Sequence, residues 1–229
     1  SAGGSLFFDE TPIFDKIRAF CEVLSKLHSL GHKFVLVVGG GKPARSYVET
    51  ARDFGANNYT QDELGIMVTR LNASLFISGL QKAYPSVLTE PKKALRVINR
   101  GMIPVFGGLL PSFTTDAVAA LIAEAVNGEF VNLTDVDGVY SADPKKSKTA
   151  KFFPELSYDE LLSMFKGSKS KPGQNMVLDL PCVNILRRSN IRTAVLNGND
   201  LENFENFVQG QTFTGTIIQD LEEEAPQEE

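Results

Sequence analysis

The sequence predicts an α/β fold in which helices cover both faces of a mostly parallel central sheet, giving a three-layer αβα sandwich. Short runs of β-branched and other apolar residues, typical of strands buried on both faces, alternate with longer stretches of helical periodicity. Such alternation is typical of βαβ units with parallel strands. No Pro/Ser-rich linker and no internal repeat interrupts residues 1–219, so we expect one domain there.

The elements can be justified in chain order. Thr11 and Pro12 form a typical N-cap and first-turn pair, and the apolar stripe behind them predicts a helix over 13–24. The apolar run 33–38 predicts a buried strand, which three glycines end. By the same criteria, further strands are predicted at 86–89, 102–106, 130–134, 191–196 and 214–219, and further helices at 43–54, 62–80, 117–123, 158–165, 177–189 and 201–208.

Composition limits the classes of function. The net charge of −5 argues against a nucleic-acid coat protein or a basic membrane-surface protein. Six of the 28 acidic residues lie in 220–229, which we expect to be a disordered tail. Two cysteines and two histidines are too few for a disulfide scaffold or a dispersed zinc site. With no apolar run of roughly 18 residues, we expect a cytoplasmic protein that binds neither nucleic-acid polymers nor membranes.

The loop after the run 33–38 is the first candidate site, because ligands of such sheets bind at the carboxyl ends of strands. Glycines 39–41 leave backbone N–H groups unshielded at the start of a helix, and Lys42 and Arg45 add positive charge. Together these features predict a phosphate site. A tight turn with two solvated basic residues is the alternative, since the spacing matches neither GxGxxG nor a Walker A loop.

Two further loops carry glycines before a helix. Gly3 and Gly4 precede the first helix and are able to bring amides to a phosphate, although a flexible N-terminal segment is the simpler interpretation of this motif alone. The loop 107–116 ends in Thr114, Thr115 and Asp116, one of which we expect to cap the following helix. Its unusual length makes it a candidate site for an acceptor substrate.

The fourth loop, 133–144, contains three aspartates and a tyrosine. A calcium-binding loop is excluded, because the required glycine spacing and terminal glutamate are absent. Asp137 and Gly138 favour a hairpin turn. In a functional interpretation, Tyr140 stacks on a base and Asp143 binds a ribose, and the spacing alone leaves both possibilities open.

In this order, the four loops resemble those of the amino acid kinase superfamily, and within it those of archaeal-type uridylate (UMP) kinases. The resemblance extends from Gly3 to about Gln219. Its most specific segments are 37–45, Asp62 with Gly65 and 69–73, 113–120, and 134–144.

The resemblance implies transfer of the γ-phosphoryl group of MgATP to UMP, which gives UDP and ADP, by a homo-oligomer that is typically a hexamer. The residues that it implies for ATP are Gly4, Ser5, Gly41, Arg45, Thr134, Asp135, Tyr140 and Asp143. Those that it implies for UMP are Gly40, Asp62, Leu109, Leu110, Pro111, Ser112, Phe113, Thr114 and Thr115. Asp116 matches an aspartate that organises the transfer site. Phosphate oxygens are expected to hold most of the Mg²⁺ coordination.

The sequence departs from the family pattern in three places. Ser1 stands where many members have a lysine, so we interpret Lys42 as the catalytic cation. Leu109 and Leu110 are apolar where relatives more often have small or polar residues. The family's first strand should precede Gly3, and almost none of it is present, so we expect a sheet strand to be lost and the ATP loop to be weakened.

Two other hypotheses remain open at this point. One is a kinase of the same superfamily that acts on isopentenyl phosphate, carbamate or an acylamino acid. His32 counts against the first because it precedes the strand, and the compact chain counts against the amino acid kinases. The other is a non-catalytic nucleotide-binding or storage protein that resembles molybdenum storage proteins. The missing lysine favours it, whereas the intact segments 39–42 and 114–116 oppose it.

Overall fold

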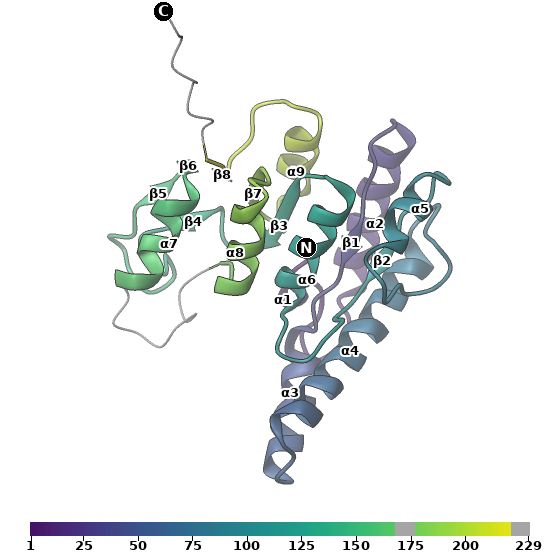
Figure 1. Cartoon of the computed structure of the whole chain (residues 1–229). Helices are drawn as coiled ribbons and strands as arrows, with labels where there is room; N and C mark the ends of the chain where they lie inside the picture. Colours follow the sequence, from purple (N-terminus) through teal and green to yellow (C-terminus); the bar gives the residue numbers. More distant parts are fainter. Residues whose placement is uncertain (168–176, 221–229) are drawn as a thin grey trace, which may run out of the picture.

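A computed structural model describes residues 1–167 and 177–220, and its sheet joins segments from both halves of the chain (Figure 1). Two short strands pair in parallel, β1 with β2, and the order β3-β7-β8-β6 forms the other part. Ala2 makes parallel bridges to Val38 and to Leu133, so the first residues lie between the two parts. The strands are β1 (Leu36–Val37), β2 (Val105–Phe106), β3 (Phe130–Thr134), β4 (Val139–Tyr140), β5 (Phe152–Phe153), β6 (Glu155–Leu156), β7 (Thr193–Asn197) and β8 (Thr216–Ile218).

Helices cover both faces of this sheet. Successive strand residues point to opposite sides, so apolar residues of one strand pack against helices on each face. Val37 packs in a core with α5, α6, α7 and α8, whereas its neighbours Leu36 and Val38 pack in a second core with α1, α2, α4 and α9. The predicted three-layer α/β sandwich is therefore confirmed. The helices are α1 (Gly4–Phe7), α2 (Phe14–Ser29), α3 (Gly41–Asp53), α4 (Asn58–Gly79), α5 (Lys93–Ile98), α6 (Thr115–Val126), α7 (Tyr158–Gly167), α8 (Leu180–Arg188) and α9 (Leu201–Val208).

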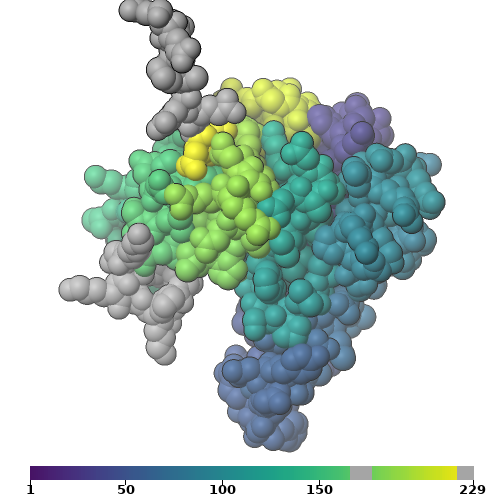
Figure 2. Space-filling model, in the orientation of Figure 1, coloured from purple at the N-terminus to yellow at the C-terminus, as the bar shows by residue number. Residues whose placement is uncertain are grey.

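The sheet is mostly parallel, as predicted. Parallel pairs are β1–β2, β3–β7 and β6–β8, whereas β7–β8 and β4–β5 are antiparallel. Helices α3 and α4 form a hairpin that projects from the rest of the molecule at the bottom of Figures 1 and 2. Within 1–167 and 177–220, no helix combines the length and apolar character that a bilayer span requires.

Three local predictions were wrong. Thr11 does not cap α2, because Ile13 is its N-cap and Phe8 bridges Pro12 in a tight loop before it. The hairpin does not turn at Asp137–Gly138, because β4 begins after that pair and turns back through 141–151. The segment 86–89 forms only an isolated bridge, from Leu88 to Phe106.

Asp220, the first residue of the predicted acidic tail, is bound to the rest of the fold. Asp220 accepts a hydrogen bond from the backbone N–H of Tyr158 at 2.8 Å and pairs with Asn190 through its backbone. Residues 221–229 lie outside the described part of the chain.

Candidate active site

The predicted loops gather at one edge of the sheet. Strands β1, β2 and β3 and the segment of Ala2 all run parallel, so their carboxyl ends meet there. The segments that follow them are 3–5, 39–42, 107–116 and 134–140, and each lies in one of the four loops that the sequence singled out.

The two glycine loops are in direct backbone contact. Gly39 N–H donates to Ala2 C=O at 3.0 Å, and Lys42 N–H donates to Phe8 C=O at 3.3 Å. A Cβ atom on Gly4 would lie 2.1 Å from the nitrogen of Gly41, so only glycine fits there. Gly41 has a φ of +64°, a left-handed conformation that favours glycine.

These loops present unpaired backbone donors. Across 1–167 and 177–220, the N–H groups of Gly4, Ser5, Gly40 and Gly41 donate to no protein group. The last of these begins α3, whose N-terminus carries partial positive charge. Clustered N–H groups at a helix N-terminus are suited to bind an anion such as phosphate.

The two predicted cations differ in their surroundings. Lys42 forms ion pairs with Asp9 at 3.2 Å and Glu10 at 3.1 Å, and hydrogen bonds to Glu10 and Asp9 raise the pKa of its ammonium group. Arg45 is exposed one turn later on α3 and forms no ion pair with any residue that the structure describes. It is therefore available to a ligand.

Asp62 on α4 lies against the predicted acceptor loop. Its Oδ2 accepts a hydrogen bond from the backbone N–H of Ser112 at 2.8 Å. Ser112 has a φ of +67°, which is unfavourable for a non-glycine residue. The loop is mostly exposed, with Leu110 and Phe113 among its outward-facing side chains. The structure thus brings Asp62 together with the loop 109–115.

The start of α6 forms a polar cluster. Thr114 is its N-cap, accepting from Ala117 N–H at 3.1 Å, and its hydroxyl donates to Asp179, the N-cap of α8. The half-buried Asp116 accepts a hydrogen bond from Ser1 Oγ at 2.6 Å. Burial raises the pKa of the Asp116 carboxyl, as does the nearby Asp179, and the Ser1 hydroxyl opposes that rise.

Two aspartates of the fourth loop bind Lys145, the residue that follows it. Asp135 pairs with Lys145, and Asp143 accepts from Lys145 N–H at 2.9 Å, which lowers the pKa of Asp143. The ring of Tyr140 packs on Phe152, with centroids 5.3 Å apart. Thr134 lies at the end of β3 beside these residues, and its C=O accepts from Gly198 N–H at 2.8 Å. No cluster of potential metal ligands occurs in the described chain.

This arrangement of loops can be compared with that of known proteins. Residues 1–197 match the model of the amino acid kinase family. The chain belongs to the amino acid kinase family. It is 42% identical over 217 residues to a uridylate kinase of Methanothermobacter thermautotrophicus, covering 94% of this chain and 96% of that protein. It is 44% identical over 204 residues to a uridylate kinase of Hyperthermus butylicus, covering 88% and 89%. The crystal structure of uridylate kinase from Archaeoglobus fulgidus superposes with a TM-score of 0.84 at 39% identity, covering 95% of this chain and 97% of that one.

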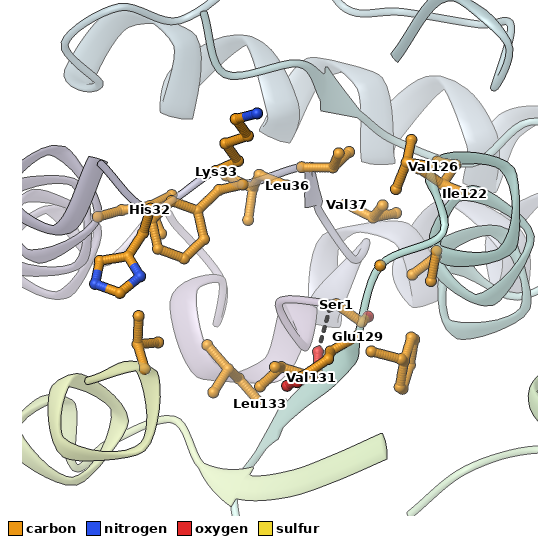
Figure 3. Close-up of a pocket in the computed structure, with 18 of the residues that line it drawn as sticks. Ser1, His32, Lys33, Leu36, Val37, Ile122, Val126, Glu129, Val131 and Leu133 are labelled. Atoms are coloured by element: carbon orange, nitrogen blue, oxygen red, sulfur yellow. Dashed lines mark hydrogen bonds between the residues drawn. The ribbon is translucent and has the colours of Figure 1, made fainter. Parts of the chain in front are cut away.

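One cavity lies outside the loop cluster of this family member. It has a volume of about 770 Å³ and lies between β1 and β3, with Ser1 on its wall (Figure 3). Its lining is largely apolar, including Leu36, Val131 and Leu133, and it contains none of the residues predicted to bind ATP or UMP. The candidate site is therefore the open cluster of loops.

The polar residues of the site that were not predicted from the sequence include Asn72 and Asp179. Asn72 is buried on α4 and bonds to the glycine loop, and Asp179 joins α8 to Thr114. Asn72 falls in the segment 69–73 that carried the family resemblance, and a polar residue on the buried face of a helix was an available signal. Asp179 precedes a Leu-Pro pair that starts a helix, a pattern that predicts an N-cap. Nothing in the sequence links it to α6.

Proposed function

We propose that this protein is a UMP kinase that transfers the γ-phosphoryl group of MgATP to UMP. The observation that supports the proposal is the contact between two glycine loops, which brings together four N–H groups that have no acceptor within residues 1–167 and 177–220. The hydrogen bond from Ser112 N–H to Asp62 supports the assignment of the loop 109–115 to the acceptor. The uridylate kinase relatives at about 40% identity over nearly their full length support the same assignment.

The chemistry requires positioning and charge neutralisation more than covalent help. A phosphate oxygen of UMP forms a bond to the γ-phosphorus, and the bond from that phosphorus to the β–γ bridging oxygen breaks, which leaves ADP and UDP. The N–H groups of the glycine loops stabilise the charge on the transferred group, with Arg45 and Lys42 as the nearby cations. The loop 109–115 and Asp62 hold UMP, and Asp116 organises the centre between the two substrates.

Mg²⁺ enters this proposal as part of the substrate MgATP. We expect this cation to be held mostly by phosphate oxygens and water. Bound in this way, the ion would neutralise charge on the β- and γ-phosphates. The ATP base and ribose are assigned to the fourth loop, with Tyr140 and Asp143 as contacts.

The test is a substrate panel. The protein is incubated with MgATP and, separately, UMP, CMP, dUMP, isopentenyl phosphate or acetylglutamate, and ADP release is measured. We expect kcat/KM to be highest for UMP. Faster turnover of another acceptor would reassign the enzyme within the family, and ATP binding without any turnover would support the nucleotide-storage hypothesis.

We further propose a homo-oligomer, with a hexamer as the expected state and the cytoplasm, where ATP and UMP occur, as its location. Met67, Leu71 and Leu75 form an exposed apolar stripe at a four-residue spacing on α4, and Tyr47 and Phe54 are exposed on α3. Light scattering tests this by comparing the mass of the wild type with that of Leu71→Glu, which places a charge in the apolar stripe. A wild-type mass near that of one chain would contradict the proposal.

A further inference from the structure

A single turn of α4 contacts both loops that the reaction needs. Asn72 is 4% exposed, and its Nδ2 donates to Gly39 C=O at 3.0 Å and to Gly40 C=O at 3.1 Å. The carboxamide thus bridges two consecutive carbonyls of the glycine loop from the side of α4. Replacing it would leave both of these oxygens without that donor.

The same turn holds the acceptor loop. Thr69 Oγ1 accepts from Gly108 N–H at 2.6 Å, and Arg70 Nε donates to Gly108 C=O at 3.0 Å. Both polar groups of one glycine are therefore bound by α4. A Cβ atom on Gly107 would lie 2.8 Å from Arg70 N, so this loop packs directly against the helix backbone.

The bridge from Asn72 sets the direction of the unpaired donors. In a planar trans peptide, the C=O of one residue and the N–H of the next point in opposite directions. Holding the carbonyls of Gly39 and Gly40 toward α4 therefore turns the N–H groups of Gly40 and Gly41 away from it. These are two of the four N–H groups that have no acceptor in the described chain.

We propose that Asn72 is a positioning residue for phosphoryl transfer, and that the turn 69–72 fixes the donor and acceptor loops relative to each other. The proposal rests on the proposed function, because it assigns those N–H groups to the transferred phosphoryl. Misdirected N–H groups lose contact with the transition state more than with either bound substrate. Removing one such donor outright lowers kcat by about 10²–10³-fold in other enzymes, and an indirect effect is smaller.

The test compares Asn72→Leu and Asn72→Asp, which remove both donated hydrogen bonds, with Ser74→Ala on the exposed face of the same helix. For the Asn72 variants, kcat is expected to fall by about 10-fold or more, with the KM values of ATP and UMP changing by less than about threefold. Ser74→Ala should match the wild type. A kcat within twofold of wild type, or a rise in either KM without a fall in kcat, would overturn the proposal.

Two further measurements keep the proposal testable. Amide hydrogen exchange of the segment 37–45 should accelerate in Asn72→Leu and not in Ser74→Ala, whichever substrate the enzyme uses. Unchanged exchange contradicts the role of Asn72, whereas absent UMP turnover by the wild type contradicts the proposed function. Should the Asn72 variants not fold, Thr69→Val tests the other contact, with the KM of UMP raised about threefold or more and that of ATP unchanged. Equal changes for both substrates would count against it.

Discussion

The Oδ2 atom of Asp62 accepts a hydrogen bond from the backbone N–H of Ser112 at 2.8 Å, across 50 residues of sequence. Ser112 is held in a left-handed conformation that costs about 1–3 kcal/mol for a non-glycine residue. The carboxylate offsets part of that strain, so the acceptor loop has its shape before any ligand arrives.

Replacing Asp62 should weaken the acceptor site selectively. We expect Asp62→Ala to raise the KM of UMP by about 10-fold or more, because both the loop contact and a ligand for the substrate are lost, while the KM of ATP changes little. Steady-state kinetics with each substrate varied in turn measures this. Glu63→Ala, at the next position of the same helix, is the matched control. Equal increases for the two substrates would show that Asp62 does not belong to the acceptor site.

Substituting Gly4 should separate the two glycine loops. In Gly4→Ala, the new Cβ atom would lie 2.1 Å from Gly41 N and 2.8 Å from Gly40 N, so one loop must move. We expect ATP binding, measured by calorimetry, to weaken by at least about 10-fold, and the melting temperature to fall. Gly65→Ala is the control, because its Cβ atom would meet only Val48 Cγ2 at 3.5 Å. That change should stabilise α4 by about 0.5–1 kcal/mol. ATP binding by Gly4→Ala at wild-type strength would disprove the close contact.

The stability of the protein should depend on the charge of Asp116. Burial raises the pKa of this carboxyl in the folded state above its ordinary value of 3.8. The folded state therefore binds the proton more tightly than the unfolded state does, and this contribution to stability falls as the pH rises from about 3.8 through the raised pKa.

The melting temperature of Asp116→Asn should consequently rise relative to that of the wild type as the pH increases over that interval. The variant should also lose kinase activity. Thermal unfolding between pH 4 and 8 measures the difference in melting temperature between the two proteins. A constant difference across this range would show that Asp116 does not titrate as described.

Lys42 should act in turnover rather than in stability. Its ion pairs with Asp9 and Glu10 are exposed, and exposed pairs contribute little to folding. We expect Lys42→Met to lower kcat by about 10-fold or more at an unchanged melting temperature. Lys33→Met, before the start of β1, is the control. A kcat equal to that of the wild type would remove Lys42 as the catalytic cation.

Much of the architecture was predictable because it depends on local periodicity. The strand 130–134 and the helix 201–208 have the predicted bounds, since their apolar spacing is regular and capping or turn residues flank them. The start of α2 was not predictable from Thr11, because a backbone hydrogen bond within the preceding loop, from Ile13 N–H to Phe7 C=O, accompanies the N-cap at Ile13.

The candidate site divides in the same way. Glycine loops at strand ends are visible in the sequence, because parallel strands bring their carboxyl ends together. The partners that shape those loops are not visible: Asn72 lies 33 residues from Gly39, and Asp179 lies 65 residues from Thr114. A periodic helix pattern marks a buried face without indicating which loop an amide on that face will bind.

The bridges from Ala2 to Val38 and Leu133 also bear on the order of folding. The loop of Gly3 and Gly4 is positioned by a strand more than 120 residues away, and contacts of such sequence separation form late because a long loop must first close. During synthesis, we expect that the proposed ATP site cannot assemble until β3 has left the ribosome. Nucleotide binding by truncated nascent chains would therefore report the moment at which the two parts of the sheet join.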